Sequence, residues 1–374
     1  MPSRIAADLA QLAHLASGGG LDLRQVALRV KADLLLSTTN PPAEDMAAFR
    51  EMAVALIPVV DEPTALILAR KLAGWRHVPP EILTALRARG GEVLAALIGH
   101  GMPLSPVEIE EIAAEGDPAA QLALAGRRDL SAAASTLLAG RDDRAVDLAL
   151  VGNLAVVLPR AALDLLVARA GATPALGLGL LARDDLPAAE LAPLFLQASL
   201  DKRLAMIEAA TAHEALAPSP RRPTITPEQF AGLVATALVD RHGAFAALAD
   251  LFGAGAEFAQ ALASDHSRQL SALTLVGCGA SPEEATRFLI GLGDDTALSV
   301  QRIFALADLM RLLNPATARR LALQIGGLAE HGGARPALQP AMDPSGTPAR
   351  AGGERPAARS SVQEMLRRLG GKTG

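Results

Sequence analysis

The sequence predicts an all-α protein in which helix pairs stack into an α-α superhelix, followed by a smaller helical subdomain and a disordered C-terminal tail. Half of the residues are hydrophobic, only 2% are aromatic and Tyr is absent, so Ala, Leu and Val must form the core. This composition favours helices over a β-sandwich or barrel. An apolar residue followed by Ser or Pro also recurs at intervals of 26, 26, 28 and 28 residues, a period typical of stacked repeats. These dipeptides are Val78-Pro79, Leu104-Ser105, Leu130-Ser131, Leu158-Pro159 and Leu186-Pro187.

The chain divides at shifts in composition. Pro218, Pro220 and Pro223 lie within six residues that cannot continue a helix, so we expect a linker there. Residues 331–360 are rich in Gly, Pro, Ala and Arg, which predicts disorder. The expected segments are N-terminal capping helices (1–74), a helical repeat array (75–217), a linker (218–225), a C-terminal helical subdomain (226–330), a disordered linker (331–360) and a short amphipathic helix (361–370).

Local signals place the helices within these segments. A helix over residues 43–60 should end or kink at Pro58. Two segments begin with the pattern of a capping box, in which the N-cap and a Glu or Gln three residues later bond to each other's backbone N–H. These starts are Ser105-Pro106-Val107-Glu108 and Thr226-Pro227-Glu228-Gln229, and Ser281-Pro282-Glu283-Glu284 is another strong start signal for a helix. The fifth repeat unit is expected to open with a helix over residues 187–197.

The turns that precede the repeat positions carry charged residues in equivalent places. Leu124-Ala125-Gly126-Arg127-Arg128-Asp129-Leu130-Ser131 is repeated as Leu181-Ala182-Arg183-Asp184-Asp185-Leu186-Pro187, whereas Asn153 replaces the Arg-Asp pair in between. These units resemble those of an uncharacterised bacterial domain-of-unknown-function family, itself similar to HEAT-like and leucine-rich-variant helical arrays. The resemblance covers residues 70–200 most closely. It implies an α-α superhelix with an interaction role and no established chemistry.

Partner contact is one of two interpretations of these turn residues. Arg127, Arg128 and Arg183 could form a charged ridge that contacts another protein, or they could lie on solvated turns beside Asp residues that favour helix N-termini. Trp75 occupies the corresponding place before Val78 and is either an interface residue or part of the core.

The expected C-terminal helix is the other candidate for binding. Val362, Met365, Leu366 and Leu369 follow the spacing of one helical face, next to Arg367 and Arg368. A helix this short is marginal by itself, so it would fold against a partner, against the acidic body of its own chain or on a membrane surface, or else remain a solvated tail. Residues 331–374 carry a net charge of +4, which leaves −9 on residues 1–330.

Other function classes find little support in the sequence. The acidic body disfavours nucleic-acid binding, which depends on neutralising phosphates. The seven His residues and one Cys show no zinc-site spacing, Gly277-Cys278-Gly279 and Gly177-Leu178-Gly179 lack the third Gly of a nucleotide loop, and no catalytic constellation stands out. Cys278 is more often a buried thiol than a reactive one in such a setting. No apolar run reaches the roughly 18 residues of a membrane span.

These observations predict a cytoplasmic, non-catalytic scaffold or regulatory adaptor that binds protein partners and needs no cofactor or metal. The alternative is an enzyme or small-ligand-binding protein with a cleft between the repeat array and the C-terminal subdomain. A deep pocket with convergent polar groups would favour that alternative.

Overall fold

The computed structural model describes residues 23–220, 224–293 and 300–328. These residues contain nineteen α-helices, one 3-10 helix and no strand, which confirms the all-helical prediction. Contacts within the chain divide it into residues 1–329 and residues 330–374. The predicted C-terminal helix over residues 361–370 lies outside the described residues. Within the described ranges, no helix is long and apolar enough to cross a membrane.

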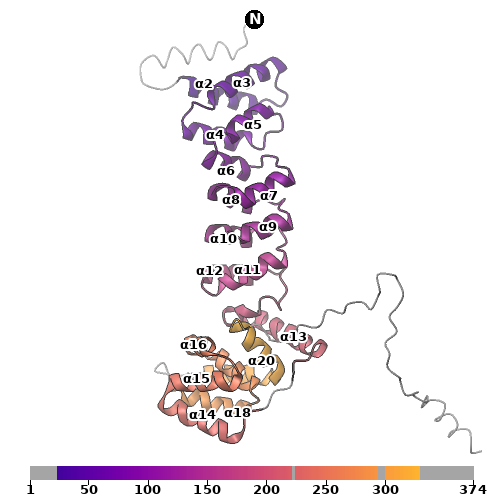
Figure 1. Cartoon of the computed structure of the whole chain (residues 1–374). Helices are drawn as coiled ribbons and strands as arrows, with labels where there is room; N and C mark the ends of the chain where they lie inside the picture. Colours follow the sequence, from indigo (N-terminus) through magenta and orange to yellow (C-terminus); the bar gives the residue numbers. More distant parts are fainter. Residues whose placement is uncertain (1–22, 221–223, 294–299, 329–374) are drawn as a thin grey trace, which may run out of the picture. The chain divides into compact units, whose positions relative to one another are not determined.

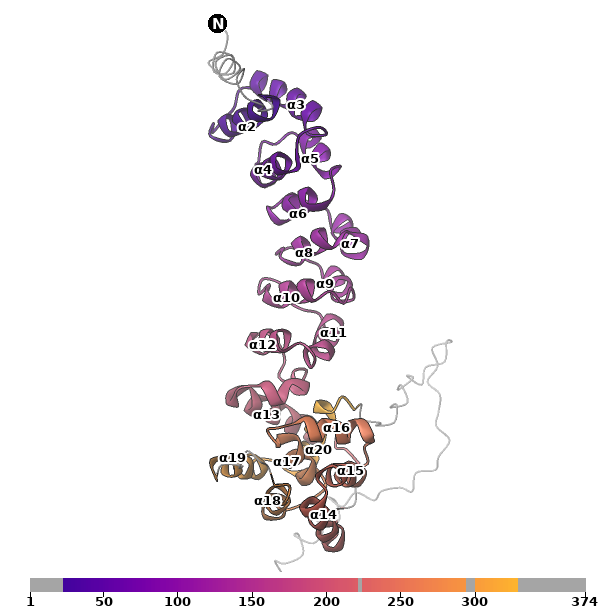
Figure 2. The same cartoon turned by 90° about the vertical axis from the view of Figure 1, so that its left-hand side faces the viewer.

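Helix pairs stack in two rows between residues 43 and 182 (Figures 1 and 2). The first row contains α4 (Glu62–Leu72), α6 (Gly91–Gly99), α8 (Pro118–Ala125), α10 (Arg144–Gly152) and α12 (Pro174–Ala182), and each of these helices packs on the next. The second row contains α3 (Ala43–Leu56), α5 (Pro80–Arg87), α7 (Pro106–Glu115), α9 (Ala132–Ala139) and α11 (Arg160–Ala170). α2 (Leu23–Leu36) packs on α3 and α4 at the N-terminal end.

The core between the two rows is made of small and branched aliphatic side chains. Leu86, Leu124, Leu138, Leu150 and Leu166 are all fully buried. They recur because residues three and four apart share one face of a helix, and a pair of short helices can bury that face only against its neighbours. The five repeat positions contribute to this core: Leu158 and Leu186 are buried, whereas Val78, Leu104 and Leu130 are partly buried and pack against it.

The remaining helices begin with η1, a 3-10 helix (Ala192–Gln197), and the long helix α13 (Leu200–Leu216). The others are α14 (Pro227–Val239), α15 (Arg241–Phe252), α16 (Ala256–Ser264), α17 (Gln269–Gly277), α18 (Pro282–Gly291), α19 (Val300–Arg311) and α20 (Pro315–Ile325). α17 lies at their centre, where Leu270 to Val276 are buried without interruption. α20 packs on α17, and also on α13 and η1 at the end of the two rows.

Most predicted helix ends are confirmed by their caps. Both predicted capping boxes form, at Ser105 and Thr226, and the helix start predicted at Ser281 also has a capping box. α3 ends just before Pro58. The helix predicted over residues 187–197 is wrong: turns precede the short 3-10 helix that begins at Ala192. Pro193 has no N–H to donate within an α-helix that starts at Pro187, which explains the difference.

Candidate functional site

Arginine side chains in the turns after α8 and α12 donate hydrogen bonds to the end of the previous helix in the first row. Arg127 follows α8, yet its guanidinium reaches the C-terminal end of α6, where it donates to the carbonyl oxygens of Ile98 (3.1 Å) and Met102 (2.8 Å). It also forms two parallel hydrogen bonds with Asp129, and this hydrogen bonding holds the pKa of that carboxyl below its ordinary value. The last carbonyls of a helix lack partners within it and carry partial negative charge, so a cation at this point stabilises the stack.

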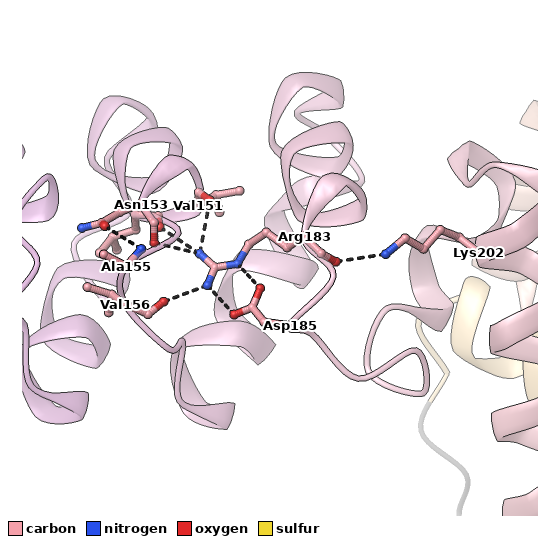
Figure 3. A network of polar contacts seen from close by, with 8 residues as sticks. Val151, Asn153, Ala155, Val156, Arg183, Asp185 and Lys202 are labelled. Atoms are coloured by element: carbon pink, nitrogen blue, oxygen red, sulfur yellow. Dashed lines mark hydrogen bonds and ion pairs between the residues drawn. The ribbon is translucent and has the colours of Figure 1, made fainter.

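Arg183 makes the same contact two helix pairs further on (Figure 3). Its side chain is only 1% exposed. It donates to the carbonyl oxygens of Val156 (2.7 Å) and Asn153 (3.1 Å), with longer contacts to those of Val151 and Leu150. Asp185 accepts two further hydrogen bonds from the same guanidinium. Arginine suits this position because its planar group offers five donors in fixed directions.

Asn153 and Lys202 extend these contacts along the row. The Asn153 side-chain amide donates to the carbonyl oxygens of Ala125 (2.9 Å) and Arg127 (2.6 Å) at the end of α8. Lys202 of α13 donates to the Arg183 carbonyl oxygen (3.0 Å). We name Arg127, Asn153, Arg183 and Lys202 the carbonyl ladder, because together they join α6, α8, α10, α12 and α13 in sequence. Asn153 therefore fills the position where the sequence repeat loses its Arg-Asp pair.

The second row has contacts of the same kind. Arg89 donates to the carbonyl oxygens of Ile57 and Val60 (both 2.9 Å) after α3, and Arg141 donates to that of Ala114 (3.1 Å) in α7. Arg169 donates to the Ala139 carbonyl oxygen and pairs with buried Asp147 at 3.1 Å. Burial raises the pKa of Asp147. Arginines thus join successive helices on both sides of the stack.

This placement corrects the expectations for the turn residues. Arg183 is buried and Arg127 is largely buried, so neither belongs to a solvated turn or to an exposed charged ridge. Arg128 is exposed. Trp75 is half-buried, packs against the core and meets the His77 ring edge-on at 6.2 Å between centroids. Met365, Leu366, Arg367, Arg368 and Leu369 lie outside the described residues.

The first row presents a surface without charge that sequence reasoning missed. The solvent-facing side of α8, α10 and α12 carries what we name the apolar strip: Ala119, Leu122, Ala123, Ala145, Leu148, Ala149, Ala175, Leu178 and Gly179. Leu122, Leu148 and Leu178 hold the same position in their helices and are 41%, 36% and 58% exposed. The polar residues within these helices are few: Gln121 and Asp147 are buried, and Arg144 lies at the start of α10.

The signal for this strip is present in the sequence. α12 reads Pro-Ala-Leu-Gly-Leu-Gly-Leu-Leu-Ala, without one polar side chain, although a helix at a protein surface normally has a polar face. Contiguous exposed apolar surface marks a binding site more often than scattered apolar residues do. The strip is therefore our main candidate for partner contact.

A hollow of about 590 Å³ is the main candidate for a small ligand. It is formed by α11, η1, α13 and α20, the region where a cleft was expected. Arg160 lies at its edge, near Asp164 (3.8 Å) and Glu190 (3.7 Å). Arg320 also lines it and forms a buried ion pair with Glu214 at 2.5 Å. Both arginines of the hollow are thus already paired with carboxylates.

Residues suited to catalysis or metal binding do not gather in the described part of the chain. There, no group of three or more His, Cys, Asp or Glu side chains is placed to hold a metal ion. Cys278 is 7% exposed, and burial raises the pKa of its thiol to about 11, which confirms the buried thiol. His266 contacts the Ser264 carbonyl oxygen, whereas Ser267 donates to Asp265, so these three residues form no Asp-His-Ser chain.

These observations define an all-helical protein whose helix pairs stack on one another and are joined by arginines. A family model described as "Uncharacterised protein conserved in bacteria (DUF2336)" matches residues 93–295, more than half of the chain. The chain belongs to this family. The match contains α8, α10 and α12 with the whole apolar strip, whereas Trp75, α19 and α20 lie outside it. Neither a curated protein nor a solved structure matches the chain.

Proposed function

We propose that this chain is a non-catalytic protein-interaction scaffold, a HEAT-like α-solenoid of the cytoplasm that binds a protein partner along the apolar strip. The observation that carries the proposal is the apolar outer face shared by three successive helices, which Arg144 at the start of α10 alone interrupts. Equivalent positions in stacked helices lie side by side, so Leu122, Leu148 and Leu178 form one ridge across the row. Burying such a ridge contributes roughly 25 cal/mol per Å² of apolar surface removed from water.

The carbonyl ladder supports this role by holding the spacing of the helices that bear the strip. Arg127, Asn153 and Arg183 each join one helix of the row to the next through backbone oxygen atoms. A surface fixed in this way loses little conformational entropy when a partner binds. The partner that fits is a protein with a complementary apolar face, such as one side of an amphipathic helix.

Two paired variants test the strip. In the strip variant, Leu148→Glu and Leu178→Glu place charges on the first row, and in the control variant Leu137→Glu and Leu165→Glu place the same charges on the second row. The four leucines are similarly exposed, between 36% and 58%. With tagged full-length proteins in native lysate, we expect the strip variant to lose the partner that wild type and control retain. For the purified pair, Kd should rise at least about thirtyfold, as for the loss of an interface hot spot. Equal binding by both variants would move the site elsewhere.

The hollow formed by α11, η1, α13 and α20 supports a second candidate function, the binding of a small ligand. Its volume of about 590 Å³ falls in the range of small-molecule pockets. Two results together would favour this candidate: partner binding that is unaltered in the strip variant, and a small molecule that stays bound to the protein through native purification.

A further inference from the structure

A recess of about 280 Å³ adjoins the apolar strip in the first row, where α4, α6 and α8 lie next to one another (Figure 2). Leu66 and Ala95 hold in α4 and α6 the position that Leu122 of the strip holds in α8, and all three line the recess. Ala96 and Gly99 of α6 line it as well. The apolar face of the strip therefore continues to α4, with a depression over the small residues of α6.

The helices around the recess end at one common edge of the row. Arg127, after α8, donates to the carbonyl oxygens of Ile98 and Met102 at the end of α6. Gly74, just after α4, lies so close to the His100 carbonyl oxygen that a Cβ added to it would be 3.1 Å away. α4, α6 and α8 are therefore parallel, and their N-terminal ends lie at the opposite edge.

Charges of opposite sign line the recess at these two edges. Arg70 is exposed in the last turn of α4, and exposed His100 directly follows α6. Glu92 is exposed in the first turn of α6, at the other edge. Arg70 and Glu92 form no ion pair with the described part of the chain. Both charges are thus available to groups on a bound partner.

The distance between the two edges matches the width of a helix. Glu92 and His100 lie eight residues apart along α6, which is about 12 Å at a rise of 1.5 Å per residue. An α-helix with its side chains is about 10–12 Å wide. A helix that lies along the row therefore has one flank beside Arg70 and His100 and the other flank beside Glu92. Its middle lies over the depression, where one large apolar side chain fills the space above Ala95 and Ala96.

We propose that the partner binds through one amphipathic helix that continues from the apolar strip across the recess to α4. This helix has acidic side chains on the flank that faces Arg70 and His100, and basic side chains on the flank that faces Glu92. A large apolar side chain between them fills the recess. Complementary charges at the rim select this pattern over its reverse, because like charges repel. The inference rests on the proposed function, since the recess continues the strip.

Photocrosslinking from the recess identifies this helix. A photoreactive phenylalanine analogue replaces Gly99, which is exposed and where an added Cβ would meet only the Ala123 Cβ, at 3.9 Å. A second strain carries the analogue at Leu148 of the strip. We expect both positions to capture the same protein. We also expect the peptide crosslinked at position 99, sequenced by mass spectrometry, to have an apolar helical face with acidic residues on one side and basic residues on the other.

The crosslinks separate this inference from the proposal that the strip binds a partner. An adduct from position 148 without one from position 99 would overturn the inference and leave the strip as the binding face. A peptide at position 99 that lacks the two charged flanks would have the same meaning. The absence of an adduct from both positions would contradict the inference and the proposed function together.

Charge reversal tests the two flanks with the purified partner. Arg70→Glu and Glu92→Arg should each raise Kd about tenfold. The matched controls, Arg287→Glu on α18 and Glu111→Arg on α7, change exposed residues away from the recess and should leave Kd unchanged. Replacing the acidic partner residue found by crosslinking with lysine should restore binding to Arg70→Glu. If Arg70→Glu and Glu92→Arg bind like wild type while the strip variant does not bind, the inference is wrong and the proposed function stands.

Discussion

Replacing Arg183 by alanine is expected to lower the free energy of unfolding by about 3–5 kcal/mol, because it removes a buried guanidinium that several carbonyl oxygens and one carboxylate share. The variant deprives the buried carbonyl oxygen of Val156 and the half-buried carbonyl oxygen of Asn153 of their donor. It also removes the partner that keeps the pKa of Asp185 low by hydrogen bonding. Urea denaturation followed by far-UV circular dichroism measures the change.

The arginines of the first turn provide graded controls for this prediction. Arg127 is 11% exposed and binds two carbonyl oxygens, so Arg127→Ala should have an intermediate effect. Arg128 is exposed, and Arg128→Ala should change the free energy of unfolding by less than about 0.5 kcal/mol. If Arg183→Ala costs no more than Arg128→Ala, the carbonyl ladder does not stabilise the stack.

The ion pair between Glu214 and Arg320 gives the second large expected effect. Glu214 of α13 accepts hydrogen bonds from the Ser219 backbone N–H (3.0 Å) and hydroxyl (2.8 Å) as well as from Arg320 of α20. Its side chain is 7% and that of Arg320 is 10% exposed. Glu214→Ala removes the carboxylate from a buried pair, and we expect it to cost about 3–5 kcal/mol at pH 7. Glu81→Ala, in an exposed pair with Arg50, should cost less than about 1 kcal/mol.

The pH dependence of this effect follows from the direction of the pKa shift. Burial alone would raise the pKa of Glu214, but the hydrogen bonds from Ser219 and Arg320 outweigh it and lower the pKa below its ordinary value. A lowered pKa in the folded state means that the carboxylate stabilises the fold above the ordinary glutamate pKa and loses this effect as the pH falls through the folded value. The difference between wild type and Glu214→Ala should therefore shrink on acidification. A difference that is constant from pH 7 to pH 3 would contradict this assignment.

Helix positions could be predicted from the sequence because their signals are local. A capping box such as Ser105 with Glu108 spans four residues, and the proline that ends α3 acts on its own helix. The role of Arg183 could not be predicted in this way. Its partners lie 27–33 residues earlier, and only the stacking of α12 on α10 brings them together. The sequence therefore left open whether Arg183 contacts a partner or lies on a solvated turn, whereas the fold buries its side chain.

The candidate sites also differ in whether their sequence signal is local or depends on residues far apart in the chain. The apolar strip has a local signal, since α12 lacks any polar side chain, and its position could have been predicted from that helix alone. The hollow, by contrast, brings Arg160 of α11 and Arg320 of α20 to one place although they lie 160 residues apart in the sequence. Such sites arise from the return of the last helices to the end of the rows, which no short stretch of sequence encodes.

Site-specific photocrosslinking in cells tests the central claim, partner binding along the apolar strip, most directly. A photoreactive phenylalanine analogue replaces Leu148 of the strip in one strain and Leu165 of the second row in another. We predict a discrete covalent adduct with one protein from position 148 and none from position 165. Adducts of equal yield from both positions, or an adduct from position 165 alone, would contradict the proposal that the strip is the binding face.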